Sequence, residues 1–208
     1  VLPIYNEPVD RTLAGLRAER AQLAAEAPQD PHVGLADPSQ LARDWDIAAL
    51  ELSDATPDPS PAELEEDARR AEAAALAVAG VTQVQSAGAG YGRRQIHMSA
   101  SNGFSGGYER TDRGLSCVAI SGEGTGMERD YAGEGRIFQA DLPDAVEIGT
   151  LAGERAVSRH GARKPKTGAF PVFYDERISA TLIGHILAAI NGASIARGSS
   201  WLRDAMGE

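Results

Sequence analysis

Histidine and cysteine are the residues of this sequence that could do metal or nucleophilic chemistry, and they are few. His32, His97 and His160 share no metal-ligand spacing with one another. His185 lies in an apolar segment, where it is either a hydrogen-bonding group for a partner or a satisfied histidine at the edge of a buried face. Cys117 has no histidine or asparagine beside it, which favours an inert apolar residue over a nucleophile.

Two glycine-rich stretches, residues 88–92 and 122–126, resemble nucleotide-binding loops only superficially. The third glycine of each comes one place too early for a dinucleotide fingerprint, and neither ends in the Gly-Lys-Ser/Thr of a P-loop. We therefore interpret them as turns. Close to the second stretch, Glu128, Asp130 and Tyr131 could line a cavity or form a solvated acidic surface, and the sequence leaves both possibilities open.

Composition excludes several classes of protein. The 208 residues carry 30 acidic and 20 basic side chains, a net charge of −10, which argues against a protein that binds the phosphate backbone of DNA. One cysteine cannot form an internal disulfide, and no stretch reaches the roughly 20 apolar residues of a membrane span. The first residues do not resemble a signal peptide, so we expect a cytoplasmic protein.

Helix-start signals precede several segments. Asp10 can cap a helix that ends before Pro28, and residues 37–40 and 60–63 each place a capping residue before proline and a Gln or Glu. The second of these motifs predicts an alanine-rich helix to about residue 79. A further helix is expected from Pro143 to about residue 160.

Between residues 81 and 142, apolar residues no longer recur with the spacing of a helix but with the two-residue spacing of a strand. Leu115, Cys117 and Ala119 alternate with Ser116, Val118 and Ile120, which is typical of a strand. Turn signals at residues 90–92, 102–103 and 112–114 predict short antiparallel strands. Residues 170–175 predict one more short strand. The expected fold class is α+β, an antiparallel β-sheet meander flanked by α-helices.

Residues 178–191 predict an amphipathic helix. Its apolar side chains fall within about half of a helical wheel, and we expect this face to be buried. These apolar residues are Ile178, Leu182, Ile183, Ile186, Leu187 and Ile190. The opposite side carries small residues such as Ala180 and Gly184, so we expect burial on both sides.

Three motifs together closely resemble a known family. They are the glycine and aromatic segment of residues 101–131, which begins SNGFSGGY, the KPKTG of residues 164–168, and residues 184–200, which contain INGASIARGSS. The resemblance is to the PmbA (TldE) branch of the TldD/PmbA family, whose members have also been called modulators of DNA gyrase. It covers about residues 28–208.

The resemblance implies a subunit of a zinc metallopeptidase that lacks the zinc site itself. The TldD branch carries an H-E-x-x-x-H helix, in which two histidines bind zinc and the glutamate is the general base. The corresponding positions here are near Ile183, Gly184 and Ala188, none of which can bind a metal. We therefore expect no cofactor in this chain, no catalytic residue, and zinc on a TldD-like partner.

The resemblance also implies that the family is longer than this chain. We expect residues 1–60 to be a helical segment and linker of an incomplete N-terminal domain. Residues 61–208 would form the α+β core of the N-terminal domain, and the C-terminal domain would lie outside the chain.

Two functions remain open at this point. The first is a non-catalytic subunit of a TldD/TldE-type complex that degrades unfolded and leader-type peptides, with a TldD-like partner or a second copy in its absence. The second is a stand-alone binding or regulatory protein of the gyrase-modulator type. Neither requires nucleic acid or membrane binding. The residues expected at a peptide or partner interface are Asn102, Phe104, Tyr108, Glu128, Asp130, Tyr131 and His185.

Overall fold

The computed structural model describes residues 13–28 and 34–205. The chain divides into two compact units. One unit is Ala36–Ala169, and the other combines Val1–Leu35 with Phe170–Glu208. The domain ranges expected from the sequence stay predictions.

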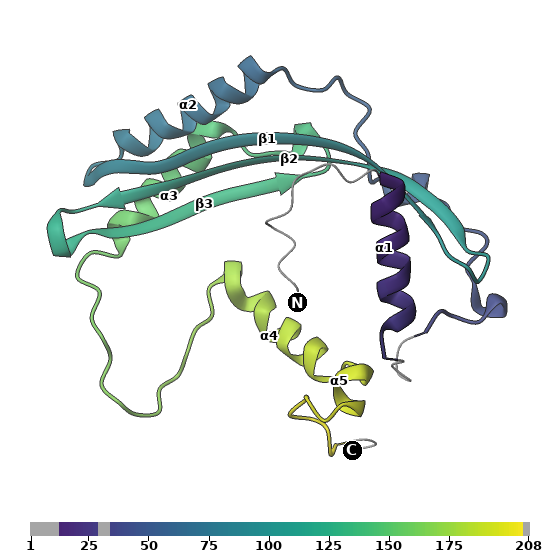
Figure 1. Cartoon of the computed structure of the whole chain (residues 1–208). Coiled ribbons are helices and arrows are strands. Elements are labelled where there is room, and N and C mark those ends of the chain that lie inside the picture. The colour runs from purple at the N-terminus through teal and green to yellow at the C-terminus, as the bar shows by residue number, and fades with distance from the viewer. Residues whose placement is uncertain (1–12, 29–33, 206–208) are drawn as a thin grey trace. The chain divides into compact units, whose positions relative to one another are not determined.

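The first unit is a layer of two helices on one face of a three-stranded antiparallel sheet (Figure 1). The strands lie side by side in chain order, and their neighbours pair antiparallel, so the α+β prediction is confirmed. The elements are α2 (Pro61–Ala77), β1 (Val81–Ser99), β2 (Ser105–Ser121), β3 (Glu128–Arg136) and α3 (Ala145–Ser158). Short 3-10 turns occur at Pro38–Gln40, Ala48–Leu50, Gly124–Gly126 and Gln139–Asp141.

Side-chain caps fix the starts of both helices. Ser60 accepts the backbone N–H of Glu63, and the Glu63 carboxylate accepts the N–H of Ser60, as the sequence predicts. Asp144 begins α3 by accepting the N–H of Val146 at 2.8 Å, and this bond lowers the pKa of the carboxyl. The capping box at Asp37 also forms, but it starts only a single 3-10 turn instead of the expected helix.

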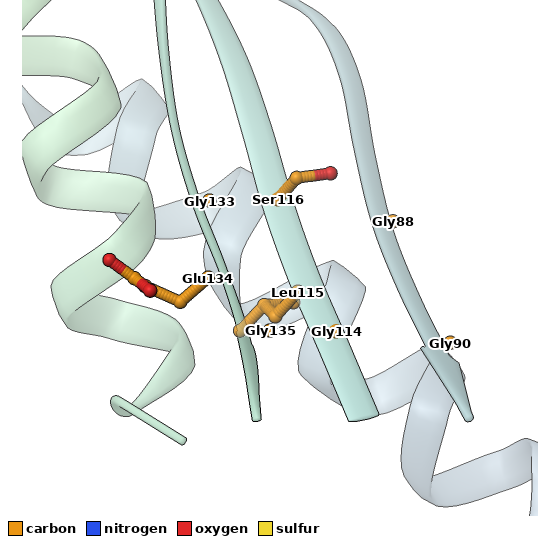
Figure 2. A pocket seen from close by; sticks show the side chains of 8 residues that line it. All are labelled: Gly88, Gly90, Gly114, Leu115, Ser116, Gly133, Glu134 and Gly135. Carbon is orange, nitrogen blue, oxygen red and sulfur yellow. The ribbon is translucent and has the colours of Figure 1, made fainter. Parts of the chain in front are cut away.

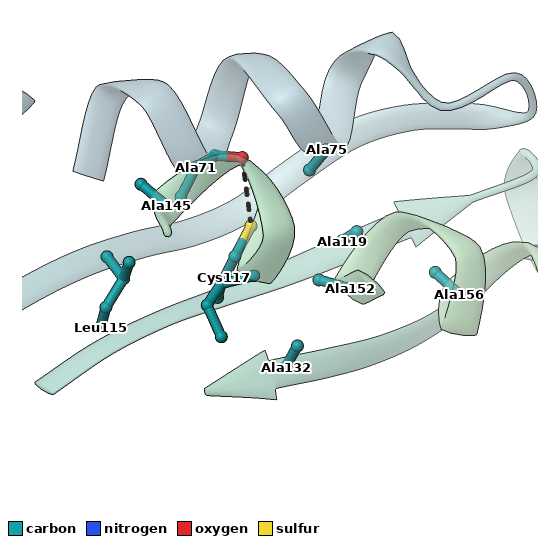
Figure 3. Packing of buried hydrophobic residues seen from close by; sticks show 10 residues of the cluster. Ala71, Ala75, Leu115, Cys117, Ala119, Ala132, Ala145, Ala152 and Ala156 are labelled. Carbon is teal, nitrogen blue, oxygen red and sulfur yellow. Dashed lines mark hydrogen bonds between the residues drawn. The ribbon is translucent and has the colours of Figure 1, made fainter. Parts of the chain in front are cut away.

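Small side chains form the core between the helices and the sheet (Figure 3). Leu115, Cys117 and Ala119 of β2 are buried, which confirms the alternation predicted for this strand. Most of the other core residues are alanines: Ala71 and Ala75 of α2, Ala132 of β3, and Ala145, Ala152 and Ala156 of α3, with Ile148 between them. Because these side chains are short, the backbones of α2 and α3 lie close to each other and to the sheet.

The expected turns at residues 90–92 and 112–114 are wrong. β1 and β2 form one long hairpin, in which Gly90 pairs with Gly114 in the middle of both strands. Glycine permits a turn but does not require one, and here the extended ladder continues through it. The turn at residues 102–103 is confirmed: Gly103 has φ +91°, and the N–H of Ala100 donates to the carbonyl of Phe104.

The second unit contains α1 (Leu13–Glu26), α4 (Glu176–Ala189) and α5 (Gly192–Ala196). Asp175 caps α4 by accepting the N–H of Arg177 at 3.0 Å. Residues 170–175 form no strand, contrary to the prediction. The expected burial of the apolar face is also wrong: Ile178, Leu182 and Ile186 are exposed, because nothing in the described part of the chain covers that face. Periodicity predicts that a helix is amphipathic but not what covers it.

Candidate functional site

A patch of bare backbone lies on the face of the sheet that α2 and α3 do not cover. Leu115 and Cys117 point toward the helices, so Ser116, which lies between them, points to the opposite, outer face. The strand register places glycines beside Ser116 in two neighbouring rows, Gly88–Ser116–Gly133 and Gly90–Gly114–Gly135. We call these six residues the glycine patch (Figure 2).

The glycine patch lines a shallow, open cavity of about 500 Å³. A Cβ atom added at Gly88 or Gly90 would meet nothing within 4 Å, so β1 is open to solvent at this point. A Cβ at Gly133 would lie 3.0 Å from the Cβ of Ser116, so β3 and β2 are closer to each other there. The patch therefore presents main-chain atoms over three strands with a single small side chain among them.

β3 is an edge strand of this sheet. The carbonyl of Tyr131 accepts a hydrogen bond from Nη1 of Arg155 at 3.2 Å, so this carbonyl points away from β2. Backbone groups alternate along a strand, which means that the N–H and C=O of Gly133 and Gly135 point the same way. The carbonyl of Gly135 also accepts Nη1 of Arg136 at 2.9 Å. No strand pairs with this edge of β3 in the described part of the chain, and a sheet edge of this kind can add a further strand.

Exposed apolar side chains flank the glycine patch on the outer face. Tyr131 is 47% exposed at one end, opposite Val118. Toward the hairpin tip, Tyr108 is 39% exposed and pairs with Ile96. The outer face therefore combines a bare centre with apolar ends, a composition suited to contact with another chain.

Three of the predicted interface residues lie near the tip of the β1–β2 hairpin. The Nδ2 of Asn102 donates to the Ala36 carbonyl at 2.9 Å, and its Oδ1 accepts the N–H of Phe104 at 3.2 Å. Phe104 is half-buried against Trp45, with ring centroids 5.6 Å apart. Of the two predicted aromatic residues, Tyr108 is therefore the more exposed and the better placed to contact a partner.

Three more predicted residues lie at the start of β3, but they do not share one surface. Tyr131 faces outward, whereas Asp130 is buried and accepts a hydrogen bond from Nη1 of Arg159 at 3.1 Å. Glu128 is half-buried, 3.8 Å from Nε of the same arginine. The carboxylates thus connect the sheet to the end of α3, while the Tyr131 side chain lies on the other face.

The structure does not bring the predicted residues into one site. Tyr108 and Val118, the neighbour of Tyr131, are ten residues apart along β2, which corresponds to about 33 Å. His185 is exposed on α4 in the other unit. The glycine patch lies between the two groups on the sheet, and sequence reasoning missed it because Gly88, Gly90 and Gly114 were interpreted as turn residues. The i, i+2 spacing of Gly88 with Gly90 and of Gly133 with Gly135 was the available signal.

A metal ion has no suitable ligands on α4. Ile183, Gly184 and Ala188 carry no donor atom, and His185 stands without a second ligand, so the donor set does not fit zinc. Over residues 13–28 and 34–205, no group of three His, Cys, Asp or Glu side chains is arranged to hold a metal. Burial raises the pKa of Cys117, which keeps the thiol protonated.

None of the helices in the described ranges has the length and apolar character needed to span a bilayer.

Comparison with known proteins identifies the family. The model of the PmbA/TldA metallopeptidase central domain matches residues 54–159, which include the whole sheet together with α2 and α3. The chain belongs to the PmbA/TldD metallopeptidase family, in its PmbA/TldE branch.

Individual relatives agree with this assignment. Metalloprotease PmbA of Escherichia coli O157:H7 is 35% identical over 182 residues, which are 86% of this chain and 39% of the relative. A crystal structure from Bacteroides thetaiotaomicron, named as a modulator of DNA gyrase, is 26% identical with a TM-score of 0.67, over 91% of this chain and 42% of that one.

A second protein with that name, from Thermotoga maritima, is 17% identical with a TM-score of 0.69, over 89% of this chain and 42% of that one, and shares the fold. The chain spans about two fifths of the length of each of these three relatives.

Proposed function

We propose that this chain is a PmbA/TldE-like subunit, without zinc of its own, of a TldD/TldE-type metallopeptidase complex that degrades or processes unfolded and leader-type peptides. The observation that carries the proposal is the glycine patch beside β3, the edge strand of the sheet. In this proposal the chain holds the peptide, and a TldD-like partner supplies the zinc and the general base.

The edge of β3 suits a peptide of arbitrary sequence. An extended peptide that pairs with β3 gains main-chain hydrogen bonds, which do not depend on side-chain identity. Its cross-strand neighbours on the outer face would be Gly133 and Gly135, so a bulky peptide side chain would meet no side chain there. Such tolerance is what an enzyme for unfolded peptides requires.

The sequence of α4 supports the absence of zinc chemistry from this chain. The positions near Ile183, Gly184 and Ala188 would have to carry two ligands and a base, and they offer no polar side chain. A hydrolytic site would therefore need residues from another subunit.

The exposed rings of Tyr108 and Tyr131 support association with another chain. Both lie on the outer face of the sheet, and large aromatic residues are enriched at interfaces between subunits. We propose that a TldD-like subunit contacts this face, or a second copy of this chain when that subunit is absent.

Removal of one donor from the β3 edge tests the proposal. Gly135→Pro eliminates an N–H that points away from β2, and proline is tolerated at the edge of a sheet. In a complex with the zinc-binding partner, we expect this variant to raise KM for an unfolded peptide by about tenfold, the effect of one lost hydrogen bond of ~1.4 kcal/mol. KM is read from initial cleavage rates at several peptide concentrations.

Gly135→Ala is the matched control. It keeps the N–H, and its Cβ would lie 3.9 Å from the nearest neighbour, the Arg113 carbonyl oxygen. We expect wild-type KM for this variant. Equal KM for the proline variant and the alanine variant would exclude the β3 edge as the peptide site. A chain that forms no complex with a TldD-like subunit would instead favour a stand-alone regulatory role.

A further inference from the structure

A second cavity lies at the tip of the β1–β2 hairpin, away from the glycine patch. Its volume is about 370 Å³, at the lower end of the range for small-ligand pockets and suited to one amino-acid residue with part of its neighbour. The segment before α2 forms one side, and the hairpin turn forms the other. The lining residues that carry the argument are Leu41, Arg43, Trp45, Phe104 and Ser105.

Hydrogen bonds hold both sides of this cavity in place. Asn102 connects the hairpin turn to the Ala36 carbonyl, and its Oδ1 accepts the N–H of Phe104. The Trp45 ring occupies the space beside Gly106, where any Cβ atom would overlap the indole. Gly106 therefore allows Trp45 to lie flat on β2, next to Phe104, and the apolar surface exists before a ligand arrives.

The polar groups of the cavity indicate the charge of its ligand. Arg43 is exposed and, in the described part of the chain, makes no hydrogen bond or ion pair. Ser105 contributes a hydroxyl whose Oγ lies 3.2 Å from Nε2 of His97. The cavity thus offers one unpaired cation beside two aromatic rings, of which Trp45 is 40% exposed. This combination complements an apolar group that carries a single negative charge.

We propose that this cavity binds the C-terminal residue of a peptide. The apolar side chain of that residue contacts Trp45 and Phe104, and its α-carboxylate pairs with the guanidinium of Arg43. The C-terminal residue and part of the residue before it occupy the cavity, and the preceding residues of the peptide extend into solvent. This inference goes beyond the proposed function, because such binding requires neither a zinc subunit nor cleavage.

Tryptophan fluorescence can report this binding directly. Trp45 and Trp201 are the two tryptophans of the chain, so Trp201→Phe leaves Trp45 of the cavity as the only tryptophan, which is excited selectively over the tyrosines. The probes are the tripeptide Ala-Ala-Phe with a free C-terminus and the same tripeptide with a C-terminal amide. We expect a saturable change with the free acid and at least about tenfold weaker binding of the amide, as for loss of a charged hydrogen bond.

A pair of arginine variants assigns the carboxylate to its partner. Arg43→Gln should weaken binding of the free acid at least about tenfold and should abolish the difference between acid and amide. Arg110→Gln is the control: Arg110 is also exposed, lies on the same hairpin outside the cavity, and has no partner among the described residues. It should bind like the parent.

Three results would overturn the proposal: no saturable change with the free acid up to millimolar concentration, equal affinity for acid and amide, or equal effects of the two arginine variants. None of these bears on the zinc-binding partner, so a failure here is distinct from a failure of the proposed function.

Discussion

At the scale of single residues, Asp54 is the centre of a buried hydrogen-bond network. Its carboxylate accepts the backbone N–H groups of Thr56 and Gln139, each at 2.8 Å, and these bonds lower its pKa, the bond from Gln139 most. Its own N–H donates to Oγ1 of Thr111, which donates in turn to the Ile137 carbonyl. Asp54 is 3% exposed and Thr111 is fully buried. This network fastens the segment before α2 to β2.

Asp54→Ala should therefore destabilise the fold. The variant removes two hydrogen bonds from backbone N–H groups to a charged carboxylate, and such bonds contribute about 1.5–3 kcal/mol each. We expect a loss of at least ~2 kcal/mol in the free energy of unfolding, measured by urea denaturation at pH 7. Asp44→Ala is the control, because Asp44 is exposed and has no partner among the described residues. A loss below ~0.5 kcal/mol for Asp54→Ala, as expected of a surface change, would contradict the network.

At the scale of elements, close contact between α2 and α3 holds the helical layer together. A Cβ atom at Gly149 of α3 would overlap the carbonyl oxygen of Ala71 in α2. One helical turn further on, a Cβ at Gly153 would lie 2.8 Å from Cγ2 of Val78. The two glycines therefore set the distance between the helices, and the alanine-rich core follows from that distance.

Gly149→Ala and Gly184→Ala should change stability in opposite directions. Alanine is favoured over glycine inside a helix by about 1 kcal/mol, and Gly184 has open space around it, so its replacement should stabilise α4. At Gly149 the new methyl group would overlap the backbone of Ala71. Overpacking of this kind costs about 1–3 kcal/mol, which should exceed the gain in helix propensity, so we expect Gly149→Ala to lower the stability. Thermal unfolding followed by circular dichroism compares the two variants. If Gly149→Ala is as stable as the parent, the helices are not in such close contact.

Sequence periodicity predicted most elements of the sheet unit, and the errors have identifiable causes. Alternation in β2, the capping residue of α2 and the proline before α3 are local signals, and the structure follows them. The i, i+2 spacing of the patch glycines is compatible with one face of a strand, but a glycine pair is also compatible with a turn. Which glycines lie side by side depends on the register across three strands, which only the assembled sheet defines.

The candidate sites were harder to predict than the elements. Neither Arg43 nor Trp45 was predicted as a site residue. The cavity that they line is completed by the hairpin turn, which lies more than 50 residues further along the chain. Asn102 and Phe104 were predicted as interface residues from the family resemblance, and they line that cavity. Burial of α4 was predicted wrongly, because an amphipathic pattern does not say which element covers it.

At the scale of the whole molecule, the chain presents surfaces suited to other chains. The outer face of the sheet is bare in the centre and apolar at its ends, and α4 exposes a row of isoleucines and leucines. The family relatives are a little more than twice as long as this chain, because 86–91% of this chain covers only 39–42% of each relative. The role that we propose for this chain is therefore to hold a peptide rather than to cut it.

Zinc content and peptidase activity, measured on the chain alone and with a TldD-like partner, test this account most directly. The purified chain, with any affinity tag removed, should contain no stoichiometric zinc by elemental analysis and should not cleave an unfolded peptide. Addition of the partner should produce a complex that contains zinc and cleaves the peptide. Stoichiometric zinc in the isolated chain, or cleavage by it, would contradict the assignment of the catalytic site to the partner.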